Sequence, residues 1–161
     1  MALLATQPAV SAYTLLGGKW NYTSLKIYKH TGYPELNYAA QSWNSAGTKI
    51  YFSVTYDTSS EIAATSYNYG NTGWDGATTL YPSSSAVPYT SASVYFNEYY
   101  VAGYGSQKRQ SVMGHELGHS VGLGEALGAV LMNPTTQGRY DWFHVYTPQQ
   151  DDINGVKAIY P

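Results

Sequence analysis

The spacing of apolar and polar positions predicts an alternation of strands and helices along the chain. From Pro34 to Asn44, apolar residues recur three and four positions apart, and Pro34 suits the first turn of a helix, so we expect a helix here. Other segments alternate between apolar and polar residues or are rich in β-branched and aromatic side chains, which is typical of strands. The predicted strands are 24–28, 49–56, 61–69, 77–81 and 92–99.

Two further helices are expected in the second half of the chain. The first runs from Gln107 to Gly122 and is followed by a loop, 123–146, that has almost no periodic pattern. The last helix is expected to begin with Thr147 as its N-cap, Pro148 in its first turn and Gln150 closing a capping box. No internal repeat interrupts this order.

Composition then removes several classes of function. The 161 residues suit one compact domain, 1–161, and only 8 of them are Lys or Arg, which argues against a nucleic-acid partner because phosphate binding needs clustered basic residues. The absence of cysteine excludes disulfides, thiolate zinc sites and a cysteine nucleophile. No run approaches the ~18 apolar residues of a membrane span, so no membrane partner is expected.

The surface is expected to be neutral and rich in hydroxyl groups, because charged residues make up 11% of the chain while 18 residues are tyrosine. This surface resembles that of many secreted bacterial hydrolases, and we therefore expect a secreted, monomeric protein. The stretch from Met1 to Leu16 lacks a basic start and a cleavage pattern, so it is not interpreted as a signal peptide.

The candidate chemistry is concentrated in one segment, which begins His115-Glu116-Leu117-Gly118-His119. Residues four apart lie one turn above each other on a helix, so His115 and His119 can point their imidazoles at one metal ion. Glu116 starts from an adjacent angle, from which its carboxylate reaches a water on the metal. A zinc ion would lower the pKa of that water toward ~7, and Glu116 would take its proton and pass it to the leaving amine.

Two residues after the histidine pair strengthen this interpretation, since a bare His-Glu-x-x-His motif often arises by chance. Gly122 lies where the helix must stop if a third ligand is to return to the metal, and glycine tolerates the left-handed conformation of such a stop. Glu125 lies ten residues after His115, where that third ligand belongs, and Met132 follows in a Val-Leu-Met-Asn-Pro segment.

This pattern resembles the metzincin peptidases, and more narrowly the matrixin branch that includes the matrix metalloproteinases. The match covers His115, Glu116, His119 and Gly122, with Met132 as the turn methionine that packs beneath the metal. The likeness also extends to the segment 150–160 and, more loosely, over the chain from about Lys19 to Tyr160. The first helix, with Ala39, Ala40 and Trp43, lies where that family has one.

The resemblance implies an α+β fold and a zinc-dependent endopeptidase that acts on a peptide or protein substrate. The expected fold has a twisted, mostly parallel five-stranded sheet with an antiparallel edge strand, an active-site helix, a methionine turn and a C-terminal helix. The segment Gly76 to Pro82 would be the edge strand, and a peptide would lie antiparallel to it. The pocket that selects a side chain would be walled near Asn133-Pro134 and by 138–140. Tyr140 is a candidate to bind the oxyanion, but we favour the alternative that it is one more packed tyrosine among eighteen.

One departure from the family pattern concerns the third ligand, because this position holds Glu125 and not histidine. Three interpretations remain open. Glu125 binds zinc and gives a two-His, one-Glu set; or the zinc is held by two histidines and water; or His144 supplies the ligand. We favour the first, because a glutamate carboxylate reaches about as far from the backbone as an imidazole nitrogen does.

A second departure concerns stabilising metals. In matrixins the strand before the active helix carries a histidine for a structural zinc, and Tyr95 stands there in this chain, so one catalytic zinc and no structural zinc is expected. Calcium is a poor fit, because Asp57, Asp75 and Glu98 are too sparse to build a cage of about six oxygen ligands without much help from the backbone.

Two alternatives to the endopeptidase stay open from the sequence. The tyrosine-rich, weakly charged surface also suits a catalytically weakened or inactive metzincin scaffold that binds carbohydrate, cell wall or protein. The retained Glu116 argues against this interpretation, because decay strikes a general base as readily as a ligand. A zinc amidase acting on non-peptide amides would use the same residues.

Overall fold

The computed structural model describes residues 12–83 and 88–161, which form an α+β fold. Within these residues five strands and five helices follow one another: β1 (Ser24–His30), α1 (Glu35–Asn44), β2 (Tyr51–Thr55), β3 (Ile62–Tyr67), β4 (Gly76–Tyr81), β5 (Ser91–Asn97), α2 (Glu98–Val101), α3 (Ser106–Ser120), the π-helix η1 (Gln137–Trp142) and α4 (Gln150–Ile159). The stretch before Leu16 reaches only partly into the described residues, since residues 1–11 and 84–87 lie outside them.

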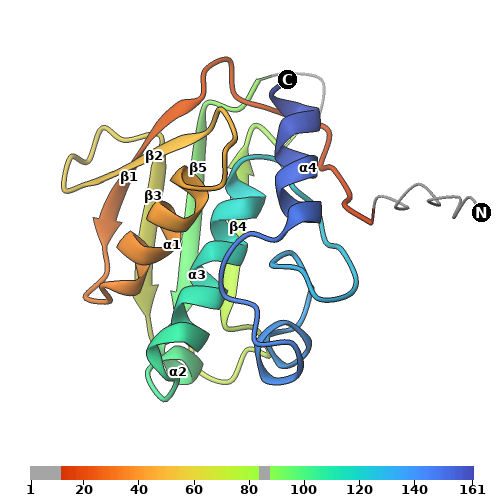
Figure 1. The fold of residues 1–161 in the computed structure, drawn as a ribbon. Coiled ribbons are helices and arrows are strands. Elements are labelled where there is room, and N and C mark those ends of the chain that lie inside the picture. The colour runs from red at the N-terminus through yellow and green to blue at the C-terminus, as the bar shows by residue number, and fades with distance from the viewer. Residues whose placement is uncertain (1–11, 84–87) are drawn as a thin grey trace, which may run out of the picture.

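The five strands form a single mixed sheet in the order β2-β1-β3-β5-β4. All neighbours are parallel except β4, which runs antiparallel to β5 with Gly76 opposite Phe96 and Tyr81 opposite Ser91. Figure 1 shows α1 and α3 side by side in front of this sheet, with α4 beyond them. The expected mostly parallel five-stranded sheet with an antiparallel edge strand is confirmed.

The core lies between the sheet and the two long helices, and two tryptophans fix α3 in it. The predicted apolar face of α1 is buried, and its Trp43 donates a hydrogen bond from Nε1 to the carbonyl of Gly114 over 2.9 Å. Trp20 donates from Nε1 to the carbonyl of Ser120, also over 2.9 Å. Both acceptors belong to α3, so buried indole groups hold this helix near its middle and at its end.

Several predicted boundaries differ from the structure by one or more residues, and three differences have a clear physical reason. The last strand ends at Asn97 rather than at residue 99, because the Asn97 side chain accepts a hydrogen bond from the Tyr99 N–H and caps α2. The final helix starts at Gln150 with Gln149 as its N-cap, so the prediction that Thr147 caps it is wrong. The reason is the buried Asp152, whose carboxylate accepts from the backbone N–H of Gln149 over 2.7 Å.

The segment predicted as a loop after Gly122 contains the π-helix η1, which is the third difference. Its residues show no helical spacing of apolar side chains. The buried side chain of this helix is a cation, Arg139, where most helices bury an apolar face. Among the described residues, no helix combines the length and apolar character that a membrane crossing requires.

The end of α3 provides a test of the fold. Gly122 has φ +102°, and a Cβ there would lie 2.7 Å from the carbonyl oxygen of Gly18. We expect Gly122→Ala to cost about 2–4 kcal/mol, combining left-handed strain with overpacking. Gly47→Ala, with φ +71° and open space around it, should cost about 1–2 kcal/mol.

Urea unfolding in the presence of a chelator measures these free energies without a contribution from metal. Gly32→Ala is the reference, because a Cβ at Gly32 would meet no atom within 4 Å and this residue lies outside the left-handed region. Equal losses for Gly122→Ala and Gly47→Ala would contradict the close approach to Gly18.

Candidate metal centre

Helix α3 places two imidazoles on one of its faces, one turn apart. The rings of His115 and His119 are 4.6 Å apart and nearly perpendicular, and their Nε2 atoms approach to 3.0 Å. His115 is buried, and the side chain of His119 is 15% exposed, so the pair sits at the floor of an opening. The spacing predicted from the sequence therefore brings both nitrogens to one point.

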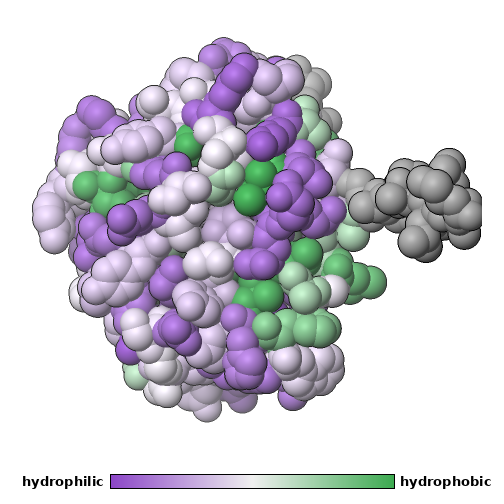
Figure 2. All heavy atoms as spheres, in the orientation of Figure 1, coloured by the Kyte–Doolittle hydropathy of each residue, from purple (hydrophilic) through white to green (hydrophobic). Residues whose placement is uncertain are grey.

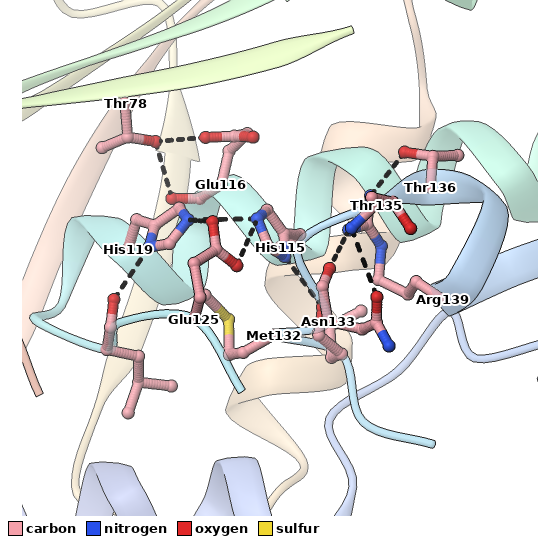
Figure 3. Close-up of polar contacts among 12 residues, drawn as sticks. Thr78, His115, Glu116, His119, Glu125, Met132, Asn133, Thr135, Thr136 and Arg139 are labelled. Atoms are coloured by element: carbon pink, nitrogen blue, oxygen red, sulfur yellow. Dashed lines mark hydrogen bonds and ion pairs between the residues drawn. The ribbon is translucent and has the colours of Figure 1, made fainter. Parts of the chain in front are cut away.

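Glu125 reaches the same point from the loop after α3. Gly122 takes the left-handed conformation expected of it, and the chain then turns back toward the helix. The Oε1 atom of Glu125 lies 3.2 Å from His119 Nε2, and Oε2 lies 3.6 Å from His115 Nε2 (Figure 3). One ligand atom from each of the three residues lies within 4.8 Å of the others, so this group could hold a metal ion.

Backbone carbonyls fix how the two imidazoles are oriented. His115 Nδ1 lies 2.9 Å from the carbonyl oxygen of Leu131, and His119 Nδ1 lies 2.8 Å from that of Leu123. A carbonyl only accepts, so each Nδ1 carries the proton and each Nε2 presents a lone pair. These are the outer contacts that metal-binding histidines commonly make.

The chemistry of the donor set fits a divalent metal. Two Nε2 lone pairs and a carboxylate oxygen converge, and such electron-rich atoms repel one another unless a proton or cation lies between them. In a tetrahedral zinc site with bonds of 2.0–2.1 Å, two nitrogens are separated by about 3.3 Å, close to the spacing here. Three protein ligands also leave a fourth position free for a water or a substrate.

The pKa values of the group reflect this convergence. Burial raises the pKa of the Glu125 carboxyl, but the hydrogen bonds and charges of His115 and His119 outweigh burial and hold that pKa well below its usual range. Burial lowers the pKa of His119, and the hydrogen bond to Glu125 together with the charge of Glu116 reverses this into a net rise. The carboxylate is thus ionised and favours a positive charge between the rings.

Glu116 lies beside the metal group without belonging to it. The residue is 4% exposed and lines the same cavity, and Thr78 Oγ1 on the edge strand β4 lies 2.7 Å from its Oε2. The same hydroxyl lies 3.0 Å from the Glu116 carbonyl oxygen. A Cβ at Gly76 would lie 2.6 Å from Glu116 Oε1, so β4 can approach the carboxylate only because this residue is glycine.

Met132 packs against the back of α3 beneath the two histidines. It is 1% exposed, and a side chain at Gly118 would overlap its sulfur atom. Asp152 of α4 holds this turn, because its carboxylate accepts from the N–H groups of Leu131 over 2.8 Å and Met132 over 3.0 Å. The turn that also supplies the Leu131 carbonyl to His115 is therefore fixed from the C-terminal helix.

The metal group opens into a cavity of about 640 Å³ between β4 and the segment after Met132. Pro134 and Arg139 line it, as expected for the pocket wall, together with Thr135 and Thr136. Arg139 is 1% exposed and donates to Ser111 Oγ, to the Asn133 carbonyl and to Thr136 Oγ1. This buried cation ties the wall to α3.

Two side chains considered from the sequence lie elsewhere. Tyr140, the candidate to bind the oxyanion, does not line the cavity, and its hydroxyl lies 3.3 Å from Gln107 Oε1, in agreement with the alternative that it is a packed tyrosine. The π-helix carries Arg139 inward and leaves Tyr140 beside the start of α3. His144 is exposed and packs edge-on against Tyr140, outside the metal group.

The residues weighed for structural metals each have other neighbours. Tyr95 packs edge-on against Tyr69. Asp57 pairs with Lys26 over 3.6 Å, Asp75 accepts from the Tyr104 hydroxyl over 3.1 Å, and Glu98 accepts from Ser66 over 2.7 Å. The three acidic side chains therefore have separate partners and are not gathered at one point.

Sequence reasoning did not identify the contacts that Thr78, Gly76 and Asp152 make at the site. Thr78 is 38 residues from Glu116, and Asp152 is 20 residues from Met132, so no local pattern joins them. The predicted edge strand and the resemblance of the last helix placed both segments near the site, but they did not identify these contacts.

No protein family model matches the chain, and no curated protein matches its sequence. The function is therefore argued from the geometry of the site.

The donor set predicts that zinc stabilises the folded protein. A ligand at 100 times its dissociation constant adds about 2.7 kcal/mol to the free energy of unfolding. We expect this stabilisation in the unaltered chain and at least a tenfold weaker zinc affinity in His119→Ala. His30→Ala is the control, because His30 is an exposed residue at the end of β1. Thermal unfolding with and without zinc measures the effect, and an equal zinc response in all three proteins would refute the assignment of the ligands.

Proposed function

We propose that this protein is a zinc-dependent endopeptidase of the metzincin type, similar to the matrixins. The observation that carries the proposal is the position of one buried carboxylate, Glu116, in the same cavity as the His115, His119 and Glu125 group. A metal ligand set alone is compatible with many functions. A metal ligand set with an adjacent general base, beside an edge strand, supports peptide hydrolysis.

Zinc is the favoured metal because two histidines, one carboxylate and an open fourth position are typical of catalytic zinc. When bound, zinc would supply Lewis acidity, which acidifies a water molecule and polarises the carbonyl of the substrate. Non-haem iron oxygenases use a similar donor set. The buried carboxylate beside the group favours a hydrolase over an oxygenase, since hydrolysis requires a group that accepts and returns a proton.

Glu116 is suited to accept and return a proton. Its Oε2 accepts a hydrogen bond from the Thr78 hydroxyl, which holds the carboxylate toward the cavity (Figure 3). In the proposed reaction Glu116 takes a proton from the attacking water and donates it to the leaving amine as the peptide C–N bond breaks. Its burial among cavity residues strengthens each electrostatic interaction it makes.

The edge strand β4 is suited to bind the substrate backbone. Within the described residues it pairs with β5 and with no other strand, and residues 76–78 and 80 line the cavity. A peptide added along β4 would be held by main-chain hydrogen bonds, which recognise any sequence and can bind the middle of a chain. This supports an endopeptidase over a zinc amidase for small substrates. The wall made by Pro134, Thr135, Thr136 and Arg139 would then select a side chain.

The surface is in keeping with a monomer that works outside the cell. Figure 2 shows a face that is mostly hydrophilic or neutral, on which apolar side chains gather only in small groups. Charged residues are 11% of the chain, so hydroxyl and aromatic side chains supply much of the polar surface. Secretion and the monomeric state are part of the proposal.

Replacement of the proposed base gives the direct test. We expect Glu116→Gln to lower the rate of peptide hydrolysis by about 10²- to 10⁴-fold, because glutamine cannot accept the proton. Zinc content should remain stoichiometric, since Glu116 is outside the ligand group. Cleavage of casein and of an internally quenched peptide, with and without a chelator, measures the rate.

Glu98→Gln is the matched control, because Glu98 lies outside the cavity and glutamine can still accept from Ser66. Its rate should equal that of the unaltered chain. Zinc-loaded protein that shows no chelator-sensitive cleavage of either substrate would instead favour the binding scaffold. Full activity in Glu116→Gln would remove Glu116 from the mechanism.

The third ligand can be tested separately. An anionic ligand reduces the positive charge that zinc presents to its water, so Glu125→His should give a more acidic water and activity that rises at lower pH. We also expect the zinc dissociation constant to change. If neither the zinc affinity nor the pH profile changes in Glu125→His, Glu125 is not a ligand.

A further inference from the structure

The segment just before the first strand lies against the loop that carries Glu125. Leu15 forms an antiparallel bridge with Leu123, and the Leu16 N–H donates to the Gly122 carbonyl over 2.8 Å. In Figure 1 this red segment passes beside α4, and Tyr13 packs closely on Gly155 of that helix. A short strand-like segment from the N-terminal part of the chain is thus paired with the ligand loop.

Thr14 makes the contacts closest to Glu125. Its carbonyl accepts from the Gly124 N–H over 2.8 Å, and its hydroxyl donates to the Glu125 carbonyl over 2.6 Å. The two hydrogen bonds flank the Cα of Glu125 on both sides. A Cβ at Gly124 would overlap Thr14 Oγ1, so a residue without a side chain is needed for this approach.

The Glu125 side chain needs such support more than the histidines do. It is 49% exposed, and among the described residues the polar contacts of its carboxylate are to the two histidines themselves. Each histidine is oriented by a carbonyl at its Nδ1. Three side-chain torsions of glutamate must be fixed when it binds a metal, so the position of the Glu125 carboxylate depends on how well the backbone of this residue is held.

We propose that Thr14 is a positioning residue for the third metal ligand, and that segment 12–16 is part of the metal centre. This rests on the proposed zinc site. By fixing the backbone on both sides of Glu125, Thr14 lowers the entropy that the carboxylate loses when it binds the metal. Leu16 of the same segment lines the cavity, so the segment also forms one side of the substrate site.

The test is the zinc dissociation constant, measured by competition with a chromophoric chelator. Loss of an outer contact weakens metal binding by 10- to 100-fold, and Thr14→Val should fall near the lower end, about tenfold, because it removes the hydroxyl with little change of shape. Thr14→Ser keeps the hydroxyl and should bind zinc as the unaltered chain does. Thr90→Val is the control, because Thr90 also donates to a carbonyl, that of Tyr81 on the edge strand.

A second set of variants separates a positioning role from a general structural one. In a Glu125→Ala background, Thr14→Val should have no further effect on zinc affinity, because Thr14 acts through Glu125. Unfolding of the metal-free proteins should be alike for Thr14→Val and Thr14→Ser. Unchanged zinc affinity in Thr14→Val, an equal loss in Thr14→Ser, or a full additional loss in the Glu125→Ala background would each overturn the proposal.

Failure of the Thr14 proposal can be distinguished from failure of the proposed peptidase function. An unaltered chain that binds no zinc would overturn both. A chain that binds zinc through Thr14-dependent positioning but cleaves no peptide would leave the metal centre intact and remove only the peptidase.

Discussion

The site depends on two backbone carbonyls that hold the histidine rings in one tautomer. The Leu131 and Leu123 carbonyls accept from the two Nδ1–H groups, and together with the one-turn spacing on α3 this directs both Nε2 lone pairs to the same point. Those carbonyls belong to the two loops that follow α3, so the loops must be placed before the helix can present a metal site. Gly122 sets the first loop, and Asp152 holds the second through two peptide N–H groups.

Much of the fold follows from local patterns in the sequence. The apolar spacing around Trp43 predicted α1, and that face is buried as expected. The edge position of β4 came from the family resemblance, and the sheet order confirms it. The π-helix around Arg139 could not be predicted in this way, because it is held by hydrogen bonds from one buried guanidinium and not by an apolar stripe.

The residues of the candidate site also separate into those that local sequence patterns predict and those that they do not. His115, His119 and Glu125 could be proposed from spacing because a helix and a left-handed glycine determine where they point. The contacts that Thr78 makes to Glu116, Asp152 to the turn at Met132 and Thr14 to Glu125 could not be predicted, since they span 20 to 111 residues of chain. Tyr140 illustrates the opposite case, since its place in the sequence made it a candidate to bind the oxyanion but the π-helix leaves its hydroxyl at Gln107.

The close packing of β4 on α3 has a consequence for how this edge strand can vary. Gly76 and Thr78 point toward Glu116, while Ala77 and Thr79 between and beyond them point to the opposite side of the sheet. Thr79 is exposed and lies outside the cavity lining, so a replacement there does not meet the acid–base group. At Gly76 a single added methyl group would meet the Glu116 carboxylate, so the inward face of this strand is tied to the chemistry.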